Sequence, residues 1–150
     1  QWSELVAQPA FVTGLAKLKS AWDEAQAAAS PAVKSQGGVA SIEALFRQAD
    51  AVNILLQPMA KRWATAAGGE HHAAPVKGEE RALQKAFRSY QCDWRRLCDL
   101  CRTTIVLDTP NQIAECLHHI AADPDVELLK GPPTKCRLSE SFDAEKLSGG

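Results

Sequence analysis

The sequence has almost no net charge and no long apolar run. Seventeen basic and eighteen acidic residues leave a net charge of −1, whereas a domain that binds duplex nucleic acid normally has a strongly basic balance. No segment approaches the roughly 18 apolar residues that a membrane-spanning helix needs. These two absences argue against nucleic acid as a partner and against a transmembrane protein.

A disulfide framework and a starting methionine are both missing from the sequence. The five cysteines are an odd number, and their spacings of 6, 3, 15 and 20 residues do not match a small secreted disulfide framework. We therefore expect reduced thiols. No secretory signal precedes Trp2, and the chain starts at Gln1 and stops at Gly150. We expect a piece of a longer precursor, in the cytoplasm or in an organelle.

The first half of the chain predicts two long helices. A length of 150 residues with 45% hydrophobic residues corresponds to about one domain with one core. Apolar residues recur at helical spacing over residues 3–29, and again from Ser41 to Trp63, where Ser41 and Glu43 favour a helix start. We expect the two helices to form a hairpin within an N-terminal helical region, residues 1–70.

The second half predicts helices and strands together. Residues 67–77, AGGEHHAAPVK, lack periodicity and predict a mobile loop and a boundary. The expected elements after it are a helix in GEERALQKAFRSY, a short helix capped by Asp93, a buried strand RTTIVLD, a helix starting at Thr109, and strands VELLK and KCRL. A strand, a helix and a strand within some thirty residues suggest a right-handed crossover. The fold class is therefore α+β, with an incomplete mixed sheet and flanking helices in residues 75–150.

The pair Cys98-x-x-Cys101 has the spacing of a zinc half-site or a redox pair. A structural zinc site needs a second pair of ligands, which Cys116, Cys136 and the histidines at 118 and 119 would supply only irregularly. Free, buried thiols are the favoured interpretation, and a zinc site at Cys98 and Cys101 is the alternative.

Three cations, Lys77, Arg81 and Lys85, follow one another at intervals of four residues and so form one stripe along a helix. Such a stripe can bind a triphosphate. It can equally be a solvated helix face that pairs with Glu79 and Glu80, so both interpretations stay open.

Asp99 comes shortly before the β-branched strand. A carboxylate at a sheet edge, opposite cationic side chains, suits a Mg²⁺ site for attack on a nucleotide phosphate. The alternative is an aspartate at a helix end that pairs with Arg95 or Arg102. Local sequence does not separate the two.

The order of these residues resembles the RelA/SpoT-type synthetase domain, over residues 75–150. The matching residues are Lys77, Arg81, Lys85, Tyr90, Asp93, Leu97, Asp99, Leu100, Arg102, Ile105, Val106, Asp143, Ser148, Gly149 and Gly150. The resemblance implies a nucleotidyltransferase-like fold that transfers pyrophosphate from ATP to the 3′-hydroxyl of a guanine nucleotide. It implies that Asp99 is the catalytic, Mg²⁺-holding aspartate, with Lys77, Arg81, Lys85 and Arg102 around the phosphates.

The chain departs from the family pattern in three ways. Arg102 stands two positions before the usual arginine, where this chain has Thr104. GEERALQ replaces the usual glycine-rich loop. The family's tyrosine that stacks on the guanine base, and its later catalytic glutamate, would lie beyond Gly150.

These departures favour a non-catalytic role, because binding needs only a surface whereas catalysis needs a complete site. We expect an interaction subunit of a larger assembly that docks through its N-terminal helices, with Trp2, Trp22 and Trp63 as interface anchors. The alternative is a pyrophosphotransferase-type enzyme, with Mg²⁺ and ATP, when full length. A zinc-stapled adaptor is the third interpretation. Because the most similar branch of the family is common in algae, the resemblance adds a plastid complex as a candidate location.

Overall fold

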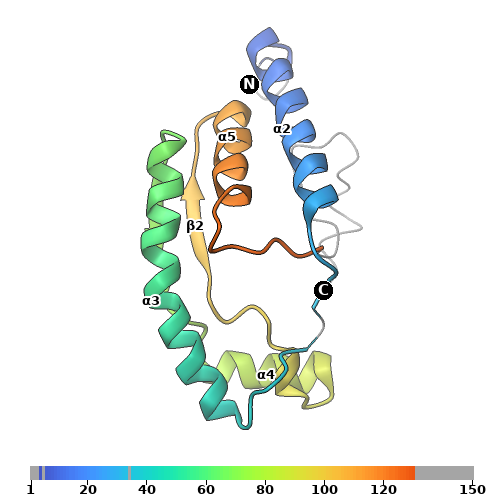
Figure 1. Cartoon of the computed structure of the whole chain (residues 1–150), viewed down its shortest axis with the longest axis vertical. Helices are drawn as coiled ribbons and strands as arrows, with labels where there is room; N and C mark the ends of the chain where they lie inside the picture. The colour runs from blue at the N-terminus through green and yellow to red at the C-terminus, as the bar shows by residue number, and fades with distance from the viewer. Residues whose placement is uncertain (1–3, 5, 34, 131–150) are drawn as a thin grey trace.

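The computed structural model describes residue 4, residues 6–33 and residues 35–130. Its elements are α2 (Pro9–Ala28), α3 (Ile42–Ala66), β1 (Glu70–Ala73), α4 (Glu79–Tyr90), the 3₁₀ helix η1 (Trp94–Arg96), β2 (Thr103–Val106) and α5 (Pro110–Ala121). In Figure 1, α3 runs along the long axis, with α4 at its lower end. Helices α5 and α2 lie side by side, on the side of β2 that is away from α3. The α+β class is confirmed.

The long helix α3 begins where the sequence predicts it. Ser41 is the N-cap, and its Oγ accepts a hydrogen bond of 3.2 Å from the backbone N–H of Ala44. Glu43 lies in the first turn, where a carboxylate interacts favourably with the helix dipole. After the helix, Gly68 has a φ of 71°, a left-handed conformation that glycine adopts without strain. The chain can therefore turn sharply into β1.

Helices α2 and α5 pack closely, and small residues make this possible. Gly14 and Ala21 of α2 and Ala114 of α5 are buried. A Cβ atom added to Gly14 would lie 3.2 Å from the backbone nitrogen of Asn111 and 3.3 Å from the Cβ of Pro110. The presence of α2 and α3 is consistent with the predicted N-terminal helical hairpin. The main packing partner of α2 is, however, α5.

Helix α5 confirms the start predicted at Thr109. The Thr109 hydroxyl accepts from the backbone N–H of Gln112 at 3.2 Å, and the Gln112 side chain accepts from the backbone N–H of Thr109 at 3.0 Å. This reciprocal capping box satisfies amide groups that the helix itself cannot pair.

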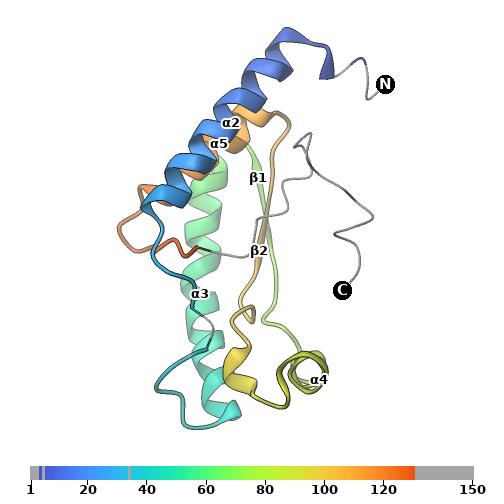
Figure 2. The same ribbon diagram turned by 90° about the vertical axis from the view of Figure 1, so that its right-hand side faces the viewer.

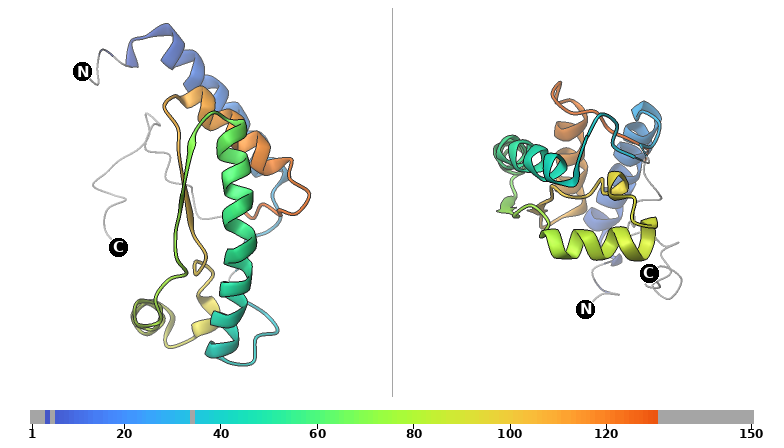
Figure 3. Two further views of the ribbon diagram at one scale, coloured as in Figure 1. Left: turned by 90° about the vertical axis from the view of Figure 1, so that its left-hand side faces the viewer. Right: turned by 90° about the horizontal axis from the view of Figure 1, so that it is seen from below.

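The two strands form an antiparallel sheet, in which Glu70 pairs with Val106 and Ala73 with Thr103. Figure 2 and the left view of Figure 3 show the strands side by side along α3. The mobile loop expected over residues 67–77 is therefore wrong in part, because β1 lies within it. EHHA has little strand propensity of its own, and the pairing with β2 and the packing on α3 decide its conformation.

The crossover expected between RTTIVLD and VELLK is also wrong. Leu129 instead forms an isolated parallel bridge with Ser30. The backbone N–H of Ser30 donates to Leu128 at 2.8 Å, and that of Lys130 donates to Ser30 at 2.7 Å. VELLK therefore joins the segment that follows α2. The strand expected in KCRL lies outside the described residues.

Alanine dominates the core. Ten of the sixteen buried hydrophobic residues in the described part of the chain are alanines, and only Leu45 and Leu97 are large side chains that are fully buried. One cluster surrounds Leu45, between α3 and α4; a second surrounds Trp63, between α3 and α5. Close approach of the backbones, rather than bulky side chains, therefore holds the elements together. Within the described ranges, no helix is both long and apolar enough to cross a membrane.

The contact at Gly14 predicts that Gly14→Val lowers the free energy of unfolding. A larger side chain must separate α2 from α5, and such overpacking costs about 1–3 kcal/mol, although valine is a better helix former than glycine. The matched control is Ala16→Val at an exposed position of the same helix, which should cost less than about 0.7 kcal/mol. Urea unfolding followed by circular dichroism measures both. Equal stability of the two variants would contradict a tight contact between the helices.

Candidate functional site around Asp99

Asp99 binds two of the lysines that the sequence singles out. Its Oδ2 accepts hydrogen bonds from Lys77 Nζ at 3.0 Å and from Lys85 Nζ at 2.8 Å. Lys77 precedes α4, Lys85 lies on α4, and Asp99 follows η1. The backbone N–H of Lys77 also donates to Leu100 at 2.9 Å. Three segments of the chain therefore meet at one carboxylate.

The charges in this cluster are partly buried. The side chain of Lys77 is 12% exposed and that of Asp99 is 43% exposed. Burial raises the pKa of Asp99, but the hydrogen bonds and charges of Lys85 and Lys77 outweigh it and leave the pKa lowered. For Lys85, desolvation lowers the pKa, yet Asp99 and Tyr90 leave it raised. Both groups therefore stay charged near neutral pH.

Tyr90 and Arg96 extend the cluster. The guanidinium carbon of Arg96 lies 4.7 Å from the centre of the Tyr90 ring, and Lys85 Nζ lies 5.5 Å from it, within the range of cation–π attraction. Sequence reasoning assigned no role to Arg96. The signal available was weak, because an arginine next to another arginine in a short helix carries no spacing information.

The other two predicted phosphate-binding residues form no ion pair with Asp99, whose partners are Lys77 and Lys85. Arg81 and Arg102 are exposed, and neither forms an ion pair with a described residue. Asp99 Oδ1 is buried, with no hydrogen-bond partner in the described part of the chain. Two ammonium groups on Oδ2 repel a divalent cation, and the described residues contain no group of three or more potential metal ligands. A Mg²⁺ role for Asp99, and phosphate binding by the cations, stay predictions.

The cysteines show no assembled zinc site in the described ranges. Cys98 is exposed, whereas Cys101 is half-buried and donates its thiol hydrogen to the backbone oxygen of Ala49 at 3.1 Å. Burial, with a contribution from Asp50, raises the pKa of the Cys101 thiol, which therefore stays protonated. Cys116 is a buried core residue, and Cys136 lies outside the described residues. The free thiol is the state that the geometry supports.

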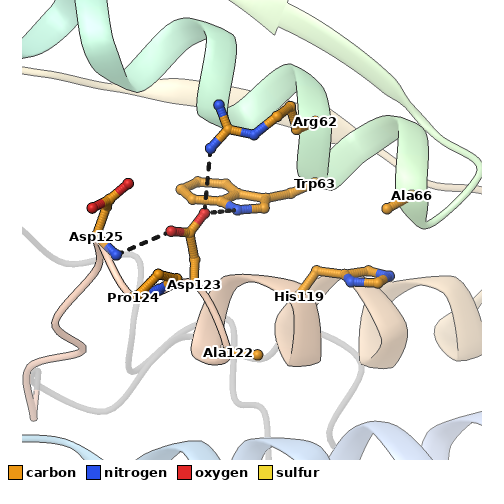
Figure 4. A pocket seen from close by; sticks show the side chains of 8 residues that line it. All are labelled: Arg62, Trp63, Ala66, His119, Ala122, Asp123, Pro124 and Asp125. Carbon is orange, nitrogen blue, oxygen red and sulfur yellow. Dashed lines mark hydrogen bonds and ion pairs between the residues drawn. The ribbon is translucent and has the colours of Figure 1, made fainter.

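A second polar contact lies where α3 and α5 end. Trp63 Nε1 donates to Asp123 Oδ2 at 2.8 Å, and Arg62 lies 3.6 Å from the same oxygen. The backbone N–H of Asp125 donates to Asp123 Oδ1 at 3.1 Å, and these hydrogen bonds and Arg62 lower the pKa of Asp123. Figure 4 shows these side chains around an open hollow of about 440 Å³. The polar groups of the hollow largely satisfy one another.

The tryptophans expected as interface anchors differ in position. Trp63 is 7% exposed and packs in the second core cluster, so it is not available as a surface anchor. This corrects the expectation, because Trp63 lies on the side of α3 that packs against Cys116 of α5. Trp22 is half-buried on α2, and Trp2 lies outside the described residues.

The chain matches no protein-family model, no curated protein and no solved structure. The resemblance to RelA/SpoT-type synthetases therefore stays a prediction that rests on the order of residues.

The ion pairs predict that Asp99→Asn destabilises the protein at neutral pH. The variant leaves Lys77 largely buried without a counter-ion, which costs about 3–5 kcal/mol in a fully buried pair; we expect about 1–2 kcal/mol here, because Asp99 is partly exposed. The matched control is Asp23→Asn on the exposed surface of α2, which should change little. Urea unfolding at pH 7 compares the variants.

The same pair gives a pH dependence. Because the pKa of Asp99 is lower in the folded chain than in the unfolded chain, its contribution is complete well above the unfolded value of about 3.9 and is lost as the pH falls below about 5. The stability difference between the parent chain and Asp99→Asn should therefore shrink on acidification. A difference that is constant from pH 7 to acid would contradict the role of Asp99 as an ionised partner.

Proposed function

We propose that this chain is a non-catalytic interaction subunit of a larger protein assembly. The supporting observation is an apolar surface on α3, formed by Val52, Ile54 and Leu55, which are 45%, 73% and 66% exposed. Single exposed apolar residues are ordinary, but Val52 and Leu55 are neighbours at i and i+3 on the helix surface, and Ile54 flanks Leu55 on the same outward side. Exposed apolar side chains grouped in this way are of the kind that marks protein interfaces. We call these three residues the α3 patch.

The charged site supports the same proposal. Asp99 is neutralised by Lys77 and Lys85, so the largely buried charge of Lys77 already has a partner within the chain. An ion-pair network of this kind can stabilise a fold and needs no catalytic role. The α3 patch, by contrast, has apolar side chains that no described element covers.

The proposal predicts that the chain, tagged and recovered from its native cells, elutes in a stoichiometric complex well above its own mass of 16.2 kDa. Ile54→Glu should release it, because a charge at an apolar contact loses its water without gaining a partner. The matched control, Thr65→Glu, alters an exposed polar position of the same helix and should leave the complex intact.

Circular dichroism should show the same helicity for both variants, because both positions are exposed. Elution of the parent chain free of any other protein would contradict the proposal. A complex that survives Ile54→Glu would contradict the α3 patch as its site.

Nucleotide binding is the second candidate, and the clustering of Lys77, Lys85 and Arg96 around Asp99 and Tyr90 favours it. It predicts that Mg²⁺ with ATP or a guanine nucleotide raises the thermal midpoint of the chain, by mass action, and that Lys77→Ala removes the rise. Lys61→Ala, at an exposed position of α3, is the control. The interaction-subunit proposal expects no rise in the parent chain.

A further inference from the structure

Helix α3 contains a proline on its outward surface, next to the α3 patch. Pro58 lies inside the helix and is exposed. Because proline has no N–H, the carbonyl oxygen of Ile54, four residues earlier, loses the donor that a regular helix supplies. Ile54 belongs to the α3 patch and is itself 73% exposed. A hydrogen-bond acceptor without its helical donor therefore lies within this apolar surface.

No other part of the described chain replaces the missing donor. Other segments and the turn after the helix donate hydrogen bonds to the α3 carbonyl oxygens of Ala49, Trp63, Ala64 and Thr65. None of these bonds reaches Ile54, and no described side chain donates to its oxygen. Water serves an exposed carbonyl well, but a partner that covers the patch removes that water. An acceptor that is buried without a donor is costly, so the partner must bring a donor with it.

The charges near the carbonyl select the kind of donor. Lys61 and Arg62 follow Pro58 by one turn, and both are exposed; Arg62 also lies 3.6 Å from Asp123. These two cations disfavour an ammonium or guanidinium donor at the same place. Asp50 lies one turn before Ile54, but helix carbonyls point towards the C-terminal end, away from it. The complementary donor is therefore a neutral amide or hydroxyl group.

We infer that the protein bound at the α3 patch presents a neutral side-chain donor, framed by apolar side chains, to the Ile54 carbonyl oxygen. This inference rests on the proposed function, because it concerns the same surface, and adds what the partner must supply. Val52 and Leu55 provide apolar area, which any hydrophobic surface can cover. The carbonyl provides selection, because a partner without a donor leaves it buried and unpaired.

Pro58→Ala tests the inference on the whole chain. The alanine restores an N–H, so the helix itself pairs the Ile54 oxygen and the donor of the partner is left without an acceptor. The thermal midpoint of the free chain should rise, because proline is the least favourable residue inside a helix. The dissociation constant should rise at least about fivefold, measured with the purified protein that co-elutes with the chain from its native cells.

The carbonyl carbon of Ile54 gives a direct readout that a change of helix shape alone does not reproduce. Its ¹³C resonance should move downfield when the partner binds the parent chain, because a hydrogen bond deshields a carbonyl carbon. In free Pro58→Ala the resonance should already lie downfield, and binding should move it little.

Two variants serve as controls. Pro58→Val also restores the N–H but keeps an apolar side chain, and it should weaken binding as much as Pro58→Ala does. Thr65→Ala improves helix propensity at an exposed position of α3 and should leave the dissociation constant unchanged. Weakening by Pro58→Ala but not by Pro58→Val would assign the effect to the proline ring and overturn the donor.

The remaining outcomes separate this inference from the proposed function. A parent chain that elutes free of other proteins overturns both. If Ile54→Glu releases the partner but Pro58→Ala binds it as tightly as the parent chain does, the α3 patch stands and the donor is overturned. An Ile54 carbonyl resonance that does not move when the partner binds overturns the donor in the same way.

Discussion

One carboxylate oxygen, Oδ2 of Asp99, fixes the arrangement of the lower part of the molecule. It accepts from Lys77 before α4 and from Lys85 on α4, so the helix cannot move away from the segment that leads into β2 without leaving two cations unpaired. The alanines at 82 and 86 contribute little side-chain burial of their own. The position of α4 therefore depends on charge as much as on packing.

The same separation of charged and apolar side chains is visible on the surface. The charges nearest the core are engaged inside the chain, whereas large apolar residues on α3 and α4 face outward. A core built mainly from alanine has few inward positions for large side chains, and several valines and leucines, with Ile54 and Phe87, remain outside. Partner binding is a use for that surface that requires no complete catalytic site.

Local signals in the sequence were sufficient for the starts of α3 and α5. They were not sufficient for Asp99, because they left pairing with Arg95 or Arg102 as an alternative to the contacts with Lys77 and Lys85. Ser41 and Thr109 act within one turn of their own helices, so their side chains predict the caps directly. The position of β1 was not predictable in this way. Its partner β2 lies some thirty residues later, with α4 and η1 between them, and no turn motif marks a pairing of that kind. The burial of Trp63 likewise depends on α5, which is distant in sequence.

The packing of α2 on α5 has a consequence for synthesis. Helix α2 ends at Ala28, but α5 begins only at Pro110, so a ribosome that adds about 5–20 residues per second needs at least several seconds to supply the partner. During that interval the small-residue face of α2 is open to water or to a chaperone. Helix α2, although it emerges early, is among the last parts of the described chain to find its native neighbour.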